Sequence, residues 1–191
     1  MSRTQTRSFR VIAAAAAVFT WGALASPGAG ATTASASITA GSLAFVSIPS
    51  AVSFAASLNG ADQTVTSAQT FDVGDASGSG TGWNITATST TFSTTGGTVH
   101  TLGTSATTVQ GTPSVGCDSN VTCTPATNAI TFPFILPAAA TAPTAQKLYN
   151  AAANTGMGNQ TVTASFRLAI PANTYAGTYS STWTYSLASA P

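Results

Sequence analysis

Charged residues are scarce in this sequence, and glutamate is missing altogether. Charged side chains make up 5% of the 191 residues, and beyond residue 31 the only basic ones are Lys147 and Arg167, against four aspartates. So few positive charges exclude a basic patch for nucleic acid or for an anionic membrane surface. We expect hydroxyl and amide side chains to keep the surface wet instead, which suits an extracellular β protein.

Groups that carry out catalysis are equally few. The chain has one histidine, His100, and four aspartates, so carboxylate-pair, zinc and triad mechanisms would depend on a handful of positions. His100 lies among apolar neighbours on an expected strand, and no Gly-x-Ser-x-Gly elbow marks a nucleophile. Asp72 and Asp75 fall short of a Ca²⁺ ligand set. We predict no enzyme, no metal site and no cofactor, and keep a hydrolase using His100 as the weakest alternative.

The first 31 residues are typical of a Sec signal peptide. Arginines 3, 7 and 10 precede an uncharged, alanine-rich stretch at 11–25, and small residues at 29–31 or 34–36 suit a cleavage site. The apolar stretch is too short for a comfortable membrane span, so a retained anchor is the less favoured alternative. We expect export, no stable membrane insertion after cleavage, and one domain over residues 32–191.

Short β-favouring runs fill the rest of the chain, separated by Gly, Ser, Asn and Pro. This spacing is typical of a sandwich or barrel of antiparallel strands rather than of βαβ units, and we predict an all-β sandwich. Side chains of one parity within residues 160–170 are apolar, which predicts one core face and one wet face. The expected strands are residues 43–48, 51–55, 64–73, 83–88, 130–134, 160–170 and 178–188.

Three further expectations concern how these runs connect. Pro171 and the turn sequence after it predict a terminal hairpin between residues 160–170 and 178–188. Residues 143–153 are good helix formers with a proline at the start, which favours one short helix. Residues 96–127 are rich in Thr, Gly and Ser, and we expect edge strands and loops there.

Cysteine usage supports export. Cys117 and Cys123 are six residues apart with turn-forming residues between them, which predicts a disulfide suited to an oxidising exterior. Closing so small a ring would stabilise the fold by about 2 kcal/mol on the chain-entropy model. A redox or metal pair would need further ligands that the sequence does not supply.

Two passages around tryptophan are the most distinctive features of the chain. The first, "DASGSGTGWNI", contains Asp75, Gly82 and Trp83, with Ile85 two residues further on. The second, "AGTYSSTWTYSL", lies close to the last residue of the sequence. Its matching residues are Gly177, Thr178, Tyr179 and Trp183, followed by Tyr185.

These passages resemble the two Trp-x-Leu motifs of the WxL domain of Gram-positive cell-surface proteins. The resemblance extends loosely over residues 43–191, including "IPSAVSF" near its start. Ile85 and Tyr185 stand where the family has leucine, so the chain resembles a divergent member. The resemblance implies an extracellular β-sandwich that attaches non-covalently to the cell wall, with peptidoglycan or another wall glycan as its partner.

The aromatic residues of the two passages are the candidate ligand contacts. Aromatic rings stack against the C–H faces of sugars, and Thr and Ser supply hydrogen bonds without charge. The candidates are Trp83, Tyr179, Trp183 and Tyr185. A role in the core is the alternative, and the parity that Trp183 shares with Tyr179, Tyr185 and Leu187 favours a row of side chains that faces the core.

A second function fits the same features. No Leu-Pro-x-Thr-Gly signal and no terminal apolar tail occur, so surface retention would need a non-covalent route. The Thr-rich terminal strand is also typical of subunits of surface fibres or coats that assemble by strand pairing. We therefore predict a secreted, wall-associated binding protein that could also contact other surface proteins, with a fibre or coat subunit as the alternative.

Overall fold

The structure is a computed structural model that describes residues 32–191. Residues 38–191 form one compact unit, while residues 32–37 are exposed and contain no strand. The predicted signal peptide, residues 1–31, lies outside the described residues. Over the described range the chain forms eleven strands and no helix, so the all-β prediction is confirmed. None of these residues belongs to a helix long and apolar enough to cross a membrane.

The larger layer is a five-stranded antiparallel sheet with the strand order β1-β2-β9-β5-β6. Its central pair, β2 and β9, is in register along all 13 residues, from Gln63 opposite Ile170 to Asp75 opposite Gly158. At about 3.3 Å per residue these strands separate the two ends of the domain by roughly 40 Å. The strands are β1 (Leu43–Ser47), β2 (Gln63–Asp75), β9 (Gly158–Ile170), β5 (Thr107–Cys117) and β6 (Phe134–Ile135).

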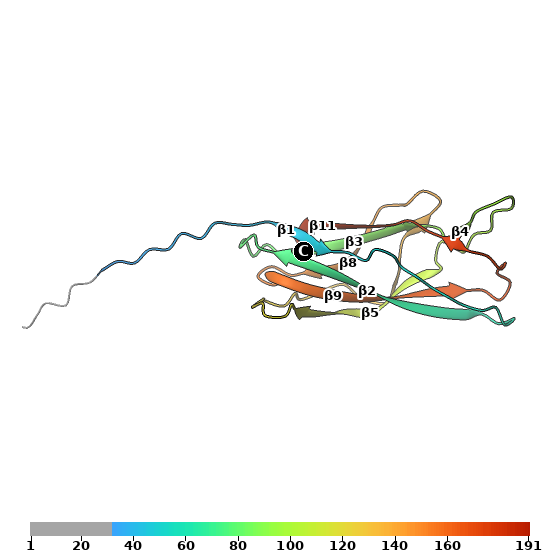
Figure 1. The fold of residues 1–191 in the computed structure, drawn as a ribbon, viewed down its shortest axis with the longest axis horizontal. Coiled ribbons are helices and arrows are strands. Elements are labelled where there is room, and N and C mark those ends of the chain that lie inside the picture. Colours follow the sequence, from blue (N-terminus) through green and yellow to red (C-terminus); the bar gives the residue numbers. More distant parts are fainter. Residues whose placement is uncertain (1–31) are drawn as a thin grey trace, which may run out of the picture. The chain divides into compact units, whose positions relative to one another are not determined.

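The second layer is built around β3, which lies between β11 on one side and β7 and β8 on the other. A small ladder of β10 and β4 continues from it. Figure 1 shows β11, β3 and β8 in one layer and β2, β9 and β5 in the other. The strands are β3 (Trp83–Thr90), β4 (Ser93–Thr94), β7 (Ala138–Ala139), β8 (Gln146–Ala151), β10 (Tyr179–Ser180) and β11 (Trp183–Ser189).

The core lies between the facing rows of the two layers. Alternating side chains of β9 are buried and their neighbours are half-exposed, as the parity of this segment predicts. Side chains from β3 and β8 cover this row from the opposite layer. The buried apolar side chains of these strands are Phe71, Val73, Trp83, Ile85, Ala87, Val109, Leu148, Tyr149, Ala151, Val162, Ala164, Phe166 and Leu168.

The predicted terminal hairpin is wrong. β9 pairs with β2 and β5, whereas β11 crosses to the other layer and pairs with β3. A hairpin would place both apolar rows on the same face of one sheet. With the strands in opposite layers, the two rows bury each other instead.

The predicted helix at 143–153 is also wrong, because residues Gln146–Ala151 form β8. β8 pairs with β3, and a register shift between Ile85 and Thr86 leaves Leu148 buried along with Tyr149. Tertiary pairing of this kind overrides a weak helix propensity. The sequence has the short apolar run that strands and helices share, so its composition did not separate the two.

Other boundaries differ more modestly. Residues 51–55 form no strand, and of residues 130–134 only Phe134 is in one. The expected strand at 178–188 is divided at Ser181 and Thr182 into β10 and β11. Within residues 96–127 the chain forms β5, which has 11 residues and has only the two-residue β6 on its outer side.

Candidate functional site

The first tryptophan, Trp83, lies at the start of β3 and is completely buried. Its indole N–H donates a 2.9 Å hydrogen bond to the Gly156 carbonyl oxygen. A Cβ atom added to Gly156 would lie 2.5 Å from the indole nitrogen, and one added to Gly82 would collide with the Ala151 carbonyl oxygen. Both glycines also have a positive φ, a backbone angle that residues with a side chain rarely adopt. Gly156 is therefore needed for the Trp83 ring to fit, and Gly82 for the chain before Trp83 to pass the Ala151 backbone. The buried ring has no surface left for a ligand.

Asp75 determines the loop that leads into Trp83. Its buried carboxylate accepts hydrogen bonds from the Ser77 backbone N–H at 3.0 Å and from the Ser77 hydroxyl at 2.6 Å. The chain of hydroxyl contacts continues from Ser77 to Ser79 at 2.9 Å and from Ser79 to Thr81 at 3.0 Å. Asp75 therefore has a structural role: it fixes the turn from β2 into β3.

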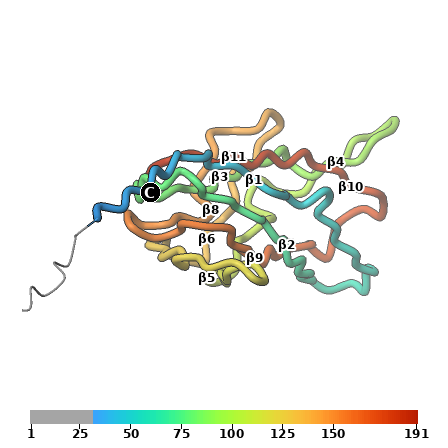
Figure 2. The backbone as a smooth tube through the Cα atoms, turned by 60° about the vertical axis from the view of Figure 1, so that its left-hand side comes forward, coloured from blue at the N-terminus to red at the C-terminus, as the bar shows by residue number. Residues whose placement is uncertain are grey.

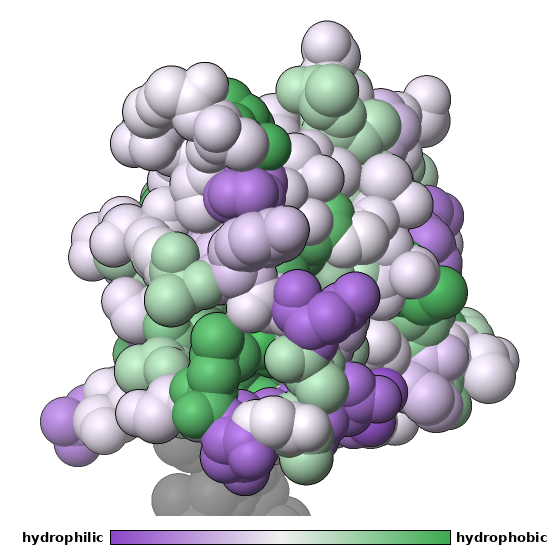
Figure 3. Space-filling view, turned by 90° about the vertical axis from the view of Figure 1, so that its right-hand side faces the viewer, coloured by the Kyte–Doolittle hydropathy of each residue, from purple (hydrophilic) through white to green (hydrophobic). Residues whose placement is uncertain are grey.

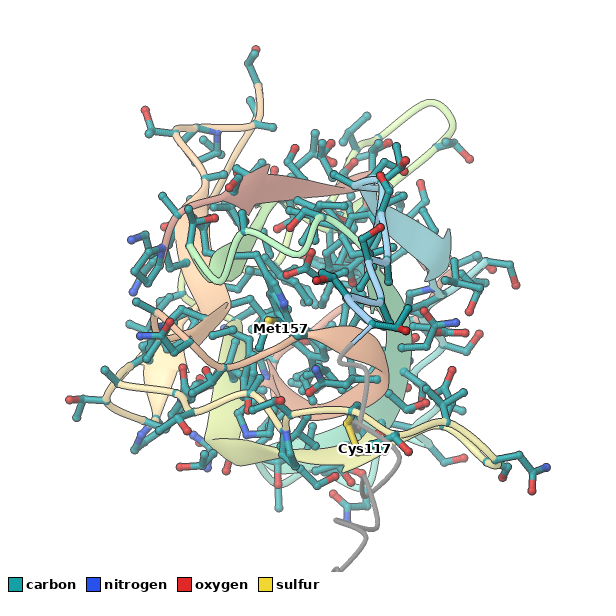
Figure 4. All side chains as sticks on the ribbon, turned by 90° about the vertical axis from the view of Figure 1, so that its left-hand side faces the viewer. Cys117 and Met157 are labelled. Atoms are coloured by element: carbon teal, nitrogen blue, oxygen red, sulfur yellow. A yellow bond between two sulfur atoms is a disulfide. The ribbon has the colours of Figure 1, made fainter. Side chains whose placement is uncertain are left out.

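The predicted disulfide is confirmed and lies at the same end of the domain as Trp83. Cys117 and Cys123 are bonded with a Cα–Cα distance of 5.6 Å. The buried Gln160 side chain holds the segment that follows, accepting from the Ala126 N–H at 2.8 Å and donating to the Thr124 carbonyl oxygen at 3.1 Å. Figure 4 looks onto this end, with Cys117 and Met157 labelled. We call residues 75–83, 117–126 and 151–158 the closed end.

Trp183 lies at the start of β11, in an aromatic cluster between the layers. Its ring centroid is 4.9 Å from that of Phe166 in an edge-on arrangement, and 6.4 Å from those of Phe54 and Phe92. Tyr185 lies edge-on to Phe71, 4.8 Å away. Trp183 and Tyr185 are half-buried and pack on the core, so the prediction that this row faces inward is confirmed. Burial also raises the pKa of the Tyr185 hydroxyl.

Two hollows open near this cluster, toward the Gln63–Ile170 end of the central strands. The first has a volume of about 620 Å³ and lies between residues 52–58 and 174–179, with Leu168 and Ile170 also lining it. The second, about 530 Å³, lies between residues 48–52 and the strands β10 and β11. Val52, Phe92 and Tyr179 line both, and neither contains a charged residue. Pockets of this size are large enough for a small ligand.

Tyr175 is the most exposed aromatic residue at the first hollow, and no sequence motif points to it. It is 64% exposed, and its ring stacks on His100 with the centroids 3.8 Å apart. The Tyr179 hydroxyl donates to the Tyr175 carbonyl oxygen at 3.0 Å. His100 is itself fixed through hydrogen bonds with Thr94. Tyr175 lies between turn-forming residues in the sequence, and this pattern predicts only a loop. Figure 3 views this end, where apolar patches lie among hydrophilic residues and residues of intermediate hydropathy.

The segment between β1 and β2 forms the shared wall of both hollows. Figure 2 shows it passing from β1 to the start of β2. Val52 and Phe54 are half-buried, whereas Ala51, Ser53 and Ala55 are exposed, which is the alternation of a strand. Residues 48–59 nevertheless make no backbone-to-backbone hydrogen bond within the described part of the chain. Buried and exposed side chains alternate at 51–55 as in a strand, but no neighbouring strand pairs with this segment through backbone hydrogen bonds in the described part of the chain.

The two aspartates weighed as Ca²⁺ ligands do not converge. The Asp75 carboxylate accepts a hydrogen bond from the Ser77 N–H. Burial and the charge of Asp118 raise the pKa of Asp72. The Thr161 hydroxyl donates to Asp118 at 2.8 Å. Residues 32–191 contain no group of three His, Cys, Asp or Glu side chains that could hold a metal ion.

The family model described as "WxL domain surface cell wall-binding" matches residues 29–191. The chain belongs to the WxL domain family. No curated protein and no solved structure matches it. The resemblance predicted from the two tryptophan passages is therefore confirmed, and the chain is a member of a family of surface domains that bind the cell wall.

The two WxL motifs are placed differently in this domain. In the first, Asp75, Gly82, Trp83 and Ile85 build the closed end and the core beside it. In the second, Gly177 and Tyr179 line the first hollow, and Trp183 lines the second. Among the four candidate ligand contacts, Tyr179 alone lines both hollows, Trp183 and Tyr185 line the second, and Trp83 lines neither.

Proposed function

We propose that this WxL domain binds a neutral glycan strand of the cell wall, namely peptidoglycan, through the first hollow. Tyr175 carries the proposal, because it is an exposed ring at the rim of an uncharged hollow and already stacks on His100. A ring supported from behind loses little freedom on binding, which favours affinity. Sugar C–H faces pack on such a ring, and hydroxyl groups around it can satisfy the sugar hydroxyls. Besides Tyr175 itself, the lining residues with hydroxyl groups are Ser53, Ser57, Thr174, Thr178 and Tyr179.

The lack of charge in the first hollow selects among wall polymers. An anionic polymer would be expected to need Lys or Arg, and neither lines the hollow. The glycan backbone of peptidoglycan can be held by stacking and neutral hydrogen bonds alone. Trp183 and Tyr185 shape the wall of the second hollow, and Trp83 is left out of the proposed surface because it is fully buried. The proposed role is binding rather than catalysis.

Sedimentation with insoluble peptidoglycan tests this proposal. The purified exported protein should pellet with the wall material, and Tyr175→Ala should weaken the apparent affinity about tenfold, the upper range for an aromatic contact. Tyr175→Phe keeps the stacking face and should bind nearly as well. Ile135→Ala removes an apolar side chain that is 52% exposed on β6, away from both hollows, and serves as the control. Equal binding by Tyr175→Ala and the unaltered protein would contradict the proposed site.

We further propose that residues 1–31 direct export and that the domain then stays at the wall without a covalent link. Two consequences can be measured on cells that produce the protein. Mass spectrometry of the surface fraction should find Thr32 as the first residue, and a wash with concentrated denaturant should release the protein from walls intact. Protein that stays on the wall after this wash would contradict the non-covalent route.

A further inference from the structure

One wall of the first hollow consists of backbone amides that pair with no other part of the protein. Residues 52–58 all line this hollow. The side chains of one face of an extended segment would supply only every second residue, so this unbroken run places the backbone itself along the hollow. In the described part of the chain, the backbone groups of residues 52–56 make no hydrogen bond to another residue. We call residues 52–56 the free-amide wall.

The free-amide wall is held in place by side chains. The Phe54 ring lies edge-on to Phe92 with the centroids 6.0 Å apart, and its centroid is 6.4 Å from that of Trp183. Just after the wall, the Gln63 side-chain amide donates to the Ser57 carbonyl oxygen at 2.9 Å. These contacts order the segment before a ligand arrives, so its amides can bind at little cost in conformational entropy.

The opposite wall, residues 174–179, uses backbone groups within the protein. Tyr179 pairs with Thr94 in the ladder of β10 and β4, and the Tyr175 carbonyl oxygen accepts from the Tyr179 hydroxyl. What this wall presents to the hollow is the exposed Tyr175 ring. The first hollow therefore has one wall suited to stacking and one wall suited to pairing with an amide.

The floor of the first hollow is apolar. Leu168 belongs to the inward row of β9, and Ile170 continues this row to the end of the strand, where it is half-buried. Phe92 and Leu102 line the hollow as well. Leu102 and Leu168 are buried, so they lie at the bottom of the hollow rather than at its rim. Such a floor favours a methyl group over a hydroxyl group, because a hydroxyl would lose its hydrogen bonds to water there.

We propose that the first hollow recognises the N-acetyl group of an amino sugar, an inference that rests on the proposed glycan binding and specifies the sugar. The sugar ring stacks on Tyr175, and the acetyl methyl group lies on the apolar floor. The acetamido group has one N–H donor and one carbonyl acceptor, and an unpaired peptide group of the free-amide wall complements both. The three surfaces of the hollow thus match the three parts of an N-acetylated sugar.

Two related sugars fit this hollow less well. A sugar with a hydroxyl in place of the acetamido group lacks the methyl contact and leaves the free-amide wall without its amide partner. A sugar with a free amine carries an ammonium group at neutral pH. No aspartate lines the first hollow, and the sequence contains no glutamate, so this cation would lose water without gaining a counter-ion. We therefore expect the acetylated sugar to bind most tightly and the amine most weakly.

Calorimetric titration of the exported protein with three sugar tetramers tests the inference. Tetramers of chitin, cellulose and chitosan have the same linkage and carry an acetamido, a hydroxyl or an amino group at the same carbon. The chitin tetramer should bind at least about tenfold more tightly than the cellulose tetramer, since the methyl contact alone is worth about that much. The chitosan tetramer should bind most weakly. No binding of the chitin tetramer, or binding no tighter than that of either other tetramer, would overturn the inference.

The floor offers a matched pair of variants. Ile170→Asn makes the floor polar, whereas Ile135→Asn makes the same change on β6, where the side chain is 52% exposed and lines neither hollow. Denaturant titration first establishes that each variant is folded. Ile170→Asn should then bind the chitin tetramer about tenfold more weakly, and Ile135→Asn should bind it like the unaltered protein. Equal affinity of the two folded variants would contradict the methyl contact with the floor.

Peptidoglycan stripped of its N-acetyl groups separates this inference from the proposed function. The unaltered protein should pellet with intact peptidoglycan and much less with the stripped material. Equal pelleting with both, together with weaker pelleting of Tyr175→Ala, would overturn acetyl recognition and leave glycan binding at the first hollow in place. If Tyr175→Ala pellets like the unaltered protein, the proposed site itself is wrong, and the acetyl inference is wrong with it.

Discussion

Trp83 and Trp183 lie in similar sequence passages, yet their surroundings have little in common. Trp83 is fully buried, its N–H is hydrogen bonded, and Gly156, which has a positive φ, makes room for its ring. Trp183 is half-buried, its neighbours are other aromatic rings, and a hollow lies beside it. The closed end is held by backbone, amide and disulfide contacts, while the other end is held by packed aromatic rings and the short β4–β10 ladder. The first motif therefore stabilises the fold, and the second lies beside a hollow at the surface.

The largest effect should come from removing the ring at the closed end. Trp83→Ala should lower the free energy of unfolding by about 3–5 kcal/mol, because it removes a fully buried ring and leaves a cavity. Trp183→Ala should cost about half as much, because that ring is only half-buried. Denaturant titration of the two variants measures the difference. Equal losses would remove the contrast between the two motifs.

The glycine beside Trp83 gives the next largest effect. Gly156→Ala should cost about 3 kcal/mol, since the new Cβ would lie 2.5 Å from both the indole nitrogen and the Ala151 Cβ. Gly60 has the same φ of 80° but nothing within 4 Å of an added Cβ, so Gly60→Ala measures the backbone strain alone. We expect about 1 kcal/mol there. A cost for Gly156→Ala no greater than for Gly60→Ala would show that close packing on Trp83 is unimportant.

The disulfide should contribute less. Replacing Cys117 and Cys123 together by serine should lower the free energy of unfolding by about 2 kcal/mol, because the ring they close is small. Wall binding should be unchanged, since the disulfide lies at the closed end. The measurement is denaturant titration together with peptidoglycan sedimentation. A loss of binding by the folded variant would mean that part of the binding site lies at the closed end, against the proposal.

The smallest effect concerns Asp72. Burial and the neighbouring Asp118 charge raise its pKa above the usual 3.8, so the folded state holds the proton more tightly than the unfolded state does. Stability therefore falls as the pH rises between these two pKa values, and the loss persists at neutral pH. Asp72→Asn should raise the melting temperature slightly at neutral pH and have no effect well below pH 3.8. An equal change at both pH values would point to a cause other than ionisation.

The sequence predicted features that depend on side-chain alternation and on local spacing. The core face of β9, the inward row of β11 and the bond between Cys117 and Cys123 all follow from such patterns. Partner choice between distant strands did not, because β11 could satisfy its apolar row against either layer. The segment predicted to be a helix forms β8 instead, because its pairing with β3 joins residues about 60 positions apart and local composition does not show such a partner.

The candidate site was predicted only in part. Tyr179, one of the predicted ligand contacts, lies at both hollows, but the turn sequence after Pro171 gives no reason to choose Tyr175. The Tyr175 ring stacks on the His100 ring, and those two residues are brought together only by the fold. Trp83 had equal aromatic character in the sequence, and its burial depends on Gly156, which is distant along the chain.

The contrast between the two ends is tested most directly by NMR titration of the labelled protein with soluble peptidoglycan fragments. The account predicts backbone shift changes confined to residues 52–58 and 174–179, and to His100, which supports Tyr175. The backbone resonances of residues 75–83 and 151–158, around Trp83, should not shift during the titration. Changes centred on the Trp83 end, or none at either end at saturating fragment, would contradict the assignment of wall binding to the first hollow.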